Sequence, residues 1–410
     1  MDPFNKLPNE IIIQILKSCC DFTSLDGLLQ MSPVVNDVFD CFYADITEAV
    51  LRSCPMTGHG IEENFRFLVA IYSKTTFTPA TIIDFLQRKP GDPLPPALEA
   101  FQSLRAINSV TAFRQVVATV AKIHRLACAC LDTFIHRIKT TTPSRATVSD
   151  GKLYDWLWNH APDPPAEPFQ SKGTHHPRWV EQYRVHRVLW AMQIYTELCA
   201  AAETRWSWSQ DNIDRLFDKS VTTGHSVTLR EDKVPVITEC LNDLSPTPLA
   251  TVHVKFPALT QLPSPESLAV RSCWALPDIP QETTTIAPER RSPSSWGRRI
   301  THAQNRGFGM MFYGLVGGYW HNPQGALWRC DTRAFRRLGI IFWDEWRLYQ
   351  MELIAMPNRA LSPEGEYVGG KDERSQLTVA YVWFSLAKNG YLREHPINPF
   401  ATDSTNIWLC

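Results

Sequence analysis

The longest amphipathic pattern in the chain covers residues 109–139, and it constrains the fold more than any other feature. Its apolar residues recur every three or four positions, which is the spacing of one face of an α-helix: Val110, Phe113, Val117, Val120, Leu131, Phe134 and Ile138. Further helices are predicted at residues 178–205, 332–355 and 374–389. Strand signals are few, with short possibilities at 234–237 and 251–256. The sequence therefore predicts a mostly α fold with few short strands.

Composition excludes several classes of protein. The chain has 410 residues, of which 44% are hydrophobic and 20% charged, and this is ordinary globular composition that rules out wholesale disorder. The formal net charge of −1 rules out a protein that is basic throughout. We expect no secretory signal and no membrane partner, because the chain lacks a long uninterrupted apolar run. The 11 scattered cysteines then predict reduced thiols in the cytoplasm or nucleus.

Changes of composition along the chain predict four parts. Residues 1–52 form a helical module, and residues 53–244 a helical domain. Residues 245–297 are rich in Pro, Ser and Thr, which predicts an extended, partly disordered connection. Residues 298–410 form a basic, aromatic-rich helical region.

The first 42 residues carry the start and stop signals of three short helices. Pro8 suits a first helical turn, and Glu10 lies near the positive end of that helix dipole. A turn over residues 21–24 leads to the second helix. Ser32 and Pro33 then provide a cap and a first-turn proline for a third helix, whose apolar face contains Val34, Val35, Val38, Phe39 and Phe42.

This segment resembles an F-box, whose family pattern begins Leu-Pro-x-Glu-Ile and matches Leu7, Pro8, Glu10 and Ile11. The resemblance covers about a tenth of the chain. It implies docking on the Skp-type adaptor protein of a cullin-RING ubiquitin ligase, while the rest of the chain captures an unknown substrate protein. The residues that it assigns to partner binding are Leu7, Pro8, Ile11, Ile15, Leu16, Leu25, Leu28, Leu29, Val34 and Val35.

An alternative to docking stays open. The same leucines and isoleucines could pack on the chain's own helical body, which would make the motif a relic or a plain helical hairpin. The chain also has neither leucine-rich repeats nor the repeats of a β-propeller, so a familiar substrate-receptor domain is missing. A second resemblance lies near the other end of the chain. The residues from Gly339 to Leu348 resemble a segment common in filamentous-fungal proteins with F-box-like N-termini.

A basic, aromatic segment covers residues 289–347, where ten arginines stand against four acidic residues. Arginine interleaved with aromatic rings suits phosphate binding and base stacking, which makes single-stranded or looped RNA a candidate ligand. The candidate contacts are Arg298, Arg299, Arg306, Arg329, Arg333, Arg336 and Arg337. The alternative is a helical core in which the arginines pair with carboxylates and stack on tryptophans.

The sequence assigns no catalytic machinery. It contains neither a G-x-S-x-G elbow nor an H-E-x-x-H motif. Weak catalytic candidates are Asp344, Glu345, His302 and His321. His124 and Cys128 stand four apart on a predicted helix, but two ligands do not close a metal site, so we expect core packing there, no metal and no cofactor.

One enzymatic alternative remains, and it rests on a weaker resemblance. In size, expected compartment and charge pattern the chain is similar to the fungal arginine-containing cyclodipeptide synthases. That family makes cyclic dipeptides from aminoacyl-tRNA, including arginyl-tRNA, in secondary metabolism. Because the aminoacyl ester is already activated, such an enzyme mainly has to position an α-amine against a carbonyl carbon. The arginine-rich segment would then contact the tRNA.

Overall fold

The computed structural model describes residues 2–57, 61–87, 95–159, 161–218, 233–268, 273–277, 333–353, 360–361, 367–368 and 376–388. The chain divides into two compact units, each assembled from two stretches of sequence. Unit 1 contains Met1–Cys130 and Val185–Asp278, and unit 2 contains Leu131–Arg184 and Ile279–Cys410. The four-part division expected from composition stays a prediction.

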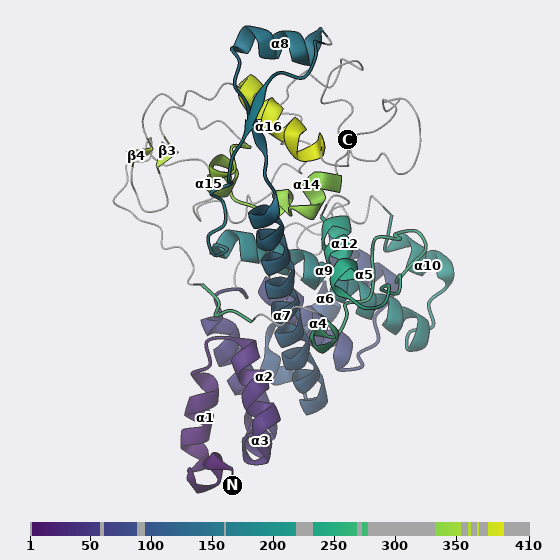
Figure 1. Ribbon diagram of the computed structural model, residues 1–410. Helices are drawn as coiled ribbons and strands as arrows, with labels where there is room; N and C mark the ends of the chain where they lie inside the picture. The colour runs from purple at the N-terminus through teal and green to yellow at the C-terminus, as the bar shows by residue number, and fades with distance from the viewer. Residues whose placement is uncertain are drawn as a thin grey trace. The chain divides into compact units, whose positions relative to one another are not determined.

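The prediction of a mostly α fold with few short strands is confirmed (Figure 1). The helices of unit 1 are η1 (Pro3–Lys6), α1 (Asn9–Lys17), α2 (Phe22–Met31), α3 (Pro33–Ser53), α4 (Ile61–Tyr72), α5 (Pro79–Gln87), α6 (Pro96–Glu99), η2 (Ala100–Gln102), η3 (Leu104–Ala106), α10 (Gln210–Arg215), α12 (Val234–Leu244) and η4 (Pro265–Ser267). Two long helices, α7 (Val110–Thr140) and α9 (Trp179–Thr204), have residues in both units.

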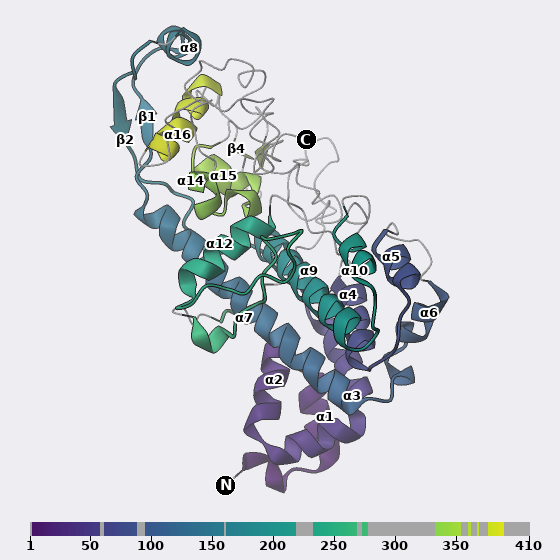
Figure 2. The same cartoon turned by 90° about the vertical axis from the view of Figure 1, so that its right-hand side faces the viewer.

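Local capping chemistry explains why the first helices begin where they do. The Asp21 side chain accepts a hydrogen bond of 2.7 Å from the backbone N–H of Ser24, and this caps α2. The Ser32 hydroxyl accepts one of 3.2 Å from Val35, and Pro33 occupies the first turn of α3. The predicted cap of α3 is therefore confirmed, and at residues 21–24, where the sequence predicted a turn, Asp21 caps α2. Figures 1 and 2 both show α1 and α3 side by side at the N-terminal end of unit 1.

Unit 2 contains a short antiparallel pair of strands and a buried helix. Its elements are β1 (Ser144–Ala146), α8 (Asp150–Trp158), β2 (Ala166–Pro168), α14 (Arg333–Arg337), η8 (Ile340–Phe342), α15 (Glu345–Gln350), β3 (Ala360–Leu361), β4 (Tyr367–Val368) and α16 (Gln376–Lys388). Strands β1 and β2 pair antiparallel, with Arg145 opposite Glu167, and β3 pairs with β4 in the same sense. Helix α16 packs against β1 and α8, where the ring of Trp156 lies 5.1 Å from those of Tyr381 and Phe384 (Figure 2).

Three sequence predictions about secondary structure are wrong. Residues 234–237 begin helix α12 rather than forming a strand, and residues 251–256 contribute only an isolated bridge between Thr251 and Thr260. The single helix predicted at 332–355 is divided into α14, η8 and α15. Gly339 ends the first piece in a left-handed conformation with φ of 63°, and Asp344 starts the last piece as a new N-cap. Apolar spacing continues across both breaks, which explains the error.

The part of the chain that the structure describes contains no helix long and apolar enough to cross a membrane.

The break at Gly339 generates a prediction about stability. A Cβ at this position would lie 2.6 Å from the ring of Phe134, and the positive φ also disfavours any side chain. Gly339→Ala should lower the free energy of unfolding by about 2 kcal/mol or more, as measured by urea denaturation with tryptophan fluorescence. The matched control is Gly27→Ala, where a Cβ meets nothing within 4 Å in helix α2. That variant should be neutral or gain up to about 1 kcal/mol. Equal effects of the two substitutions would contradict this account.

Candidate functional site

The first three helices, α1, α2 and α3, have one side that packs on the rest of unit 1. The ring centroid of Phe22 in α2 lies 5.1 Å from that of Phe65 in α4. Asp26 of α2 forms an ion pair with Arg125 of α7, with an N–O distance of 3.1 Å. Asp40 of α3 forms one with Arg114, also of α7, at 2.7 Å. Apolar and charged contacts thus cover this inner side.

Several apolar residues in and beside these helices are instead exposed to solvent. Leu7 and Ile11 are 38% and 47% exposed, and Met31, the last residue of α2, is 78% exposed. Pro8 is also exposed, while Ile15, Leu28 and Val34 are half-buried. The apolar docking surface, as we define it, consists of Leu7, Pro8, Ile11, Ile15, Leu28, Met31 and Val34.

A hydrogen bond connects the start of the chain with the junction of α2 and α3. The Ser32 hydroxyl, at the junction of α2 and α3, donates to the Asp2 carboxylate at 2.6 Å. This hydrogen bond, with a second from the backbone of Phe4, holds the pKa of Asp2 below its ordinary value. The contact brings the start of the chain, and so Leu7, to the junction that Met31 precedes. Met31 therefore belongs to the same end of the helical trio as Leu7.

The structure divides the ten residues that the sequence assigned to partner binding. Six of them lie on the apolar docking surface. The other four are buried inside unit 1 and are not available to a partner in this conformation: Leu16, Leu25, Leu29 and Val35. Sequence analysis missed Met31. Its signal was weak, since it is a single apolar residue just before a capping serine.

The arginine-rich segment is described only in part. Arg298, Arg299, Arg306, Arg329, His302 and His321 lie outside the described residues. In α14, Arg336 is half-buried and Arg337 is exposed, and the backbone oxygen of Arg337 accepts a hydrogen bond of 3.1 Å from Arg137. Arg333 starts this helix and Glu345 starts α15, but their side chains are not among those described. Nucleic-acid binding by this segment stays a prediction.

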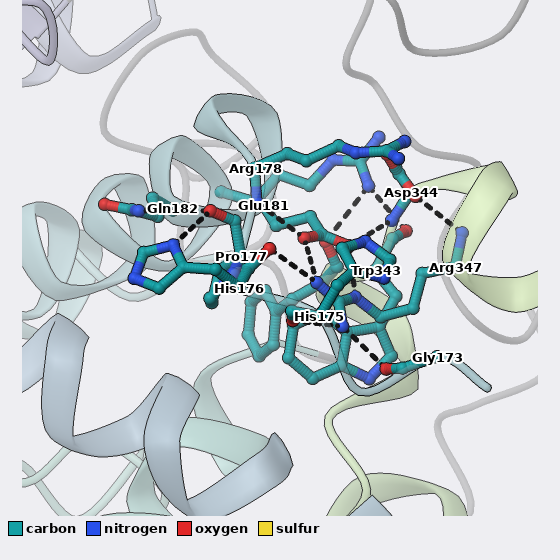
Figure 3. A network of polar contacts seen from close by, with 12 residues as sticks. Gly173, His175, His176, Pro177, Arg178, Glu181, Gln182, Trp343, Asp344 and Arg347 are labelled. Atoms are coloured by element: carbon teal, nitrogen blue, oxygen red, sulfur yellow. Dashed lines mark hydrogen bonds and ion pairs between the residues drawn. The ribbon is translucent and has the colours of Figure 1, made fainter. Parts of the chain in front are cut away.

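Arg347, which belongs to the same arginine-rich segment, is buried in unit 2. Its side chain and that of Glu181 are both 0% exposed and meet through two hydrogen bonds, from Nε to Oε1 at 2.7 Å and from Nη2 to Oε2 at 2.8 Å (Figure 3). The remaining guanidinium N–H groups donate to the backbone oxygens of Gly173, His175 and His176. The guanidinium carbon also lies 4.6 Å from the ring centre of Trp343. All N–H groups of the guanidinium are therefore hydrogen-bonded within the protein.

Asp344 completes this network as a structural group. Its Oδ1 accepts from the backbone N–H of Arg347 at 2.7 Å, which caps α15, and its Oδ2 accepts from Arg178 at 2.9 Å (Figure 3). Burial and the nearby Glu181 carboxylate raise the pKa of Asp344 to about 6. Burial also acts to raise the pKa of Glu181, but Arg347 outweighs it and holds that pKa below its ordinary value. Protein donors therefore bind both Asp344 oxygens, which makes this residue part of the buried ion-pair network, and a catalytic role for it stays a prediction.

Within the described ranges, no group of three or more His, Cys, Asp and Glu side chains is arranged to hold a metal ion. No family model, no curated protein and no solved structure matches this chain.

The Arg347–Glu181 pair generates a second prediction. Arg347→Met leaves the Glu181 charge buried without its partner and should lower the free energy of unfolding by about 3–5 kcal/mol, as measured by urea denaturation. The matched control is Arg52→Met, whose pair with Glu48 lies on the surface with the Arg52 side chain 77% exposed. That change should cost at most about 1 kcal/mol.

A double variant separates the lost charge partner from lost packing. Replacing both Arg347 and Glu181 with Met removes the unpaired charge, so part of the loss should be recovered. Recovery cannot be complete, because the three backbone oxygens that Arg347 served lose their donor. If the double variant were less stable than Arg347→Met alone, an unpaired Glu181 charge would not be the cause.

Proposed function

We propose that this chain is an F-box-type adaptor of the cytoplasm or nucleus. Its apolar docking surface binds a Skp-type protein of a cullin-RING ubiquitin ligase, and the rest of the chain presents a substrate protein. The observation that carries this proposal is the exposure of Leu7, Ile11 and Met31 on helices whose other side is already packed. The Leu-Pro-x-Glu-Ile pattern gives the surface its proposed partner, because Leu7, Pro8 and Ile11 belong to both.

The physical case rests on what a partner would gain by covering this surface. Burying one large apolar side chain is worth roughly 1.5–3 kcal/mol. Several partly exposed side chains therefore provide enough free energy to offset the cost of association. The surface also needs no unfolding before it binds, since the α2 and α3 caps and the contacts with Arg114 and Arg125 hold the helices in place. A preorganised surface keeps most of its binding energy.

The burial of the remaining motif residues supports the same proposal. Leu16, Leu25 and Val35 are each 0% exposed and form the core on which the exposed residues are mounted. A plain helical hairpin packed on its own body would be expected to cover Leu7 and Ile11 as well. The cyclodipeptide synthase alternative stays a prediction, and no described residue favours it over docking.

The docking surface is tested by Ile11→Asp and Met31→Asp, assayed with purified Skp-type adaptor from a filamentous fungus. The wild-type chain should bind in a calorimetric titration. Each variant should weaken binding by at least about tenfold, because about 1.4 kcal/mol of apolar burial is lost and a charge is desolvated. Unfolding midpoints should stay within error, since both side chains are exposed in the free protein.

A surface variant serves as the control, and a core variant shows which substitution would be uninformative. Val254→Asp changes an equally apolar residue that is 87% exposed elsewhere in unit 1, and it should bind like the wild type. Leu16→Asp, in contrast, places a charge in the core and should unfold the module, so its loss of binding would say nothing about contact. Failure of the wild-type chain to bind, or an equal loss in Val254→Asp, would reject the proposal.

A further inference from the structure

A second cluster of reactive groups lies in unit 1, apart from the docking surface. His124 and Cys128 stand one turn apart on α7, and both are buried. Trp274, in the described stretch of residues 273–277, lies against them. The backbone N–H of Trp274 donates to the sulfur of Cys128 at 3.4 Å, and the backbone oxygen of Trp274 lies 2.8 Å from Nε2 of His124. These two hydrogen bonds fix the neighbouring residue, Cys273, beside α7.

The hydrogen bonds of His124 determine its protonation at one nitrogen. A carbonyl oxygen only accepts, so Nε2 of His124 must carry a proton to bond with Trp274. Its Nδ1 lies 3.2 Å from Nε2 of His186, and the two rings stack with centroids 5.4 Å apart. With Nε2 protonated, His124 offers no lone pair to a metal on the side that faces Cys128. The cluster is therefore suited to thiol chemistry rather than to metal binding.

Cys273 differs in reactivity from the buried thiols of the same unit. It is exposed, and hydrogen bonds with Cys128 and His124 lower the pKa of its thiol to about 4, with the charge of Arg125 adding to the effect. Burial instead raises the pKa of Cys19 and Cys54 to about 11 and that of Cys199 to about 12. At neutral pH Cys273 is thus a thiolate that solvent reaches, and the others are protonated.

Cys128 supplies the second thiol. It is 1% exposed and lies in hydrogen-bond contact with Cys273, and neither residue is part of a disulfide. An accessible thiolate beside a protected second thiol is the arrangement of redox-responsive cysteines. A small pocket lined by His124, His186, Trp190 and Leu276, among others, has room for a water-sized molecule next to the cluster.

We propose that Cys273 and Cys128 form an oxidation-sensitive pair, in which a hydroperoxide oxidises Cys273 and Cys128 then converts the product to an intramolecular disulfide. This inference is independent of the docking function.

The chemistry balances in two steps. The Cys273 sulfur attacks one oxygen of the peroxide, so an S–O bond forms, the O–O bond breaks, and the second oxygen leaves as hydroxide and takes a proton to become water. The sulfur is oxidised to sulfenic acid and the peroxide is reduced. The Cys128 sulfur then displaces the sulfenic hydroxyl, so the S–S bond forms and the S–O bond breaks. The Cys128 proton leaves with the hydroxyl as a second water.

The first experiment treats the reduced full chain with one equivalent of hydrogen peroxide, blocks remaining thiols and identifies linked peptides by mass spectrometry. The wild-type chain should yield a Cys128–Cys273 linked peptide. Cys128→Ser should instead accumulate a sulfenic acid at Cys273, trapped by dimedone. Cys273→Ser should yield neither product. The matched control is Cys41→Ser, which removes another exposed cysteine and should leave the link intact. Oxidation of Cys41 before Cys273, or a wild-type sulfenic acid with no link, would overturn the proposal.

A second measurement keeps the proposal testable if Cys128→Ser fails to fold. Alkylation of Cys273 by iodoacetamide in the wild-type chain should proceed at nearly the same rate at pH 6 and pH 8. An ordinary thiol such as free cysteine should speed up by roughly 50–100-fold over that range, because its thiolate fraction grows. Replacing His124 with Asn should slow alkylation of Cys273 at pH 6 by at least about tenfold, since His124 is one of the groups that lower the pKa of this thiol. A Cys273 rate that follows that of free cysteine would reject the reactive thiolate.

Discussion

The two-sided packing of the first three helices is the constraint on which the proposed function depends. Small helical modules bury little surface alone, so one side must rest on a larger body if the other is to stay open. The inner side of this module meets α4 through Phe22 and meets α7 through Asp26 and Asp40. The pair of Asp40 with Arg114 is exposed and worth little in free energy, whereas the Asp26 carboxylate is buried against Arg125. Both pairs set the orientation of the module on α7. Apolar contacts such as Phe22 with Phe65 provide the stability.

Local signals in the sequence predicted much of the fold. The helix predicted at residues 109–139 corresponds to α7, because apolar spacing over many turns leaves no alternative. The helix predicted at residues 178–205 corresponds to α9. The caps at Asp21 and Ser32 were also predictable, since a capping side chain and its N–H lie within three residues of each other. The errors came where distant residues decide the structure. Gly339 ends a helix where a turn meets the ring of Phe134, and no local pattern marks that approach.

The candidate site was predictable to a similar extent. The motif lies on the helices that carry the exposed apolar residues, but spacing alone could not separate Ile11, which faces solvent, from Leu16, which is buried. Both are apolar residues on the same short helix, and only the packing of α1 on α3 distinguishes their sides. The thiol cluster was even less accessible to sequence reasoning. His124 and Cys128 were visible as a helical pair, whereas Cys273 joins them only through the two hydrogen bonds of Trp274.

Charge counted along the sequence is a poor guide to charge at the surface. Arg347 added to the apparent basic excess of residues 289–347, yet its guanidinium is enclosed by Glu181, three backbone oxygens and the ring of Trp343. In unit 2 it therefore holds the segment around Gly173 to helix α15 and offers nothing to a phosphate. Cys273 shows the converse, since hydrogen bonds with Cys128 and His124 lower the pKa of a thiol that the sequence alone would count as neutral. In both cases the chemistry of the residue follows from what surrounds it in three dimensions, and composition alone would have assigned each the opposite role.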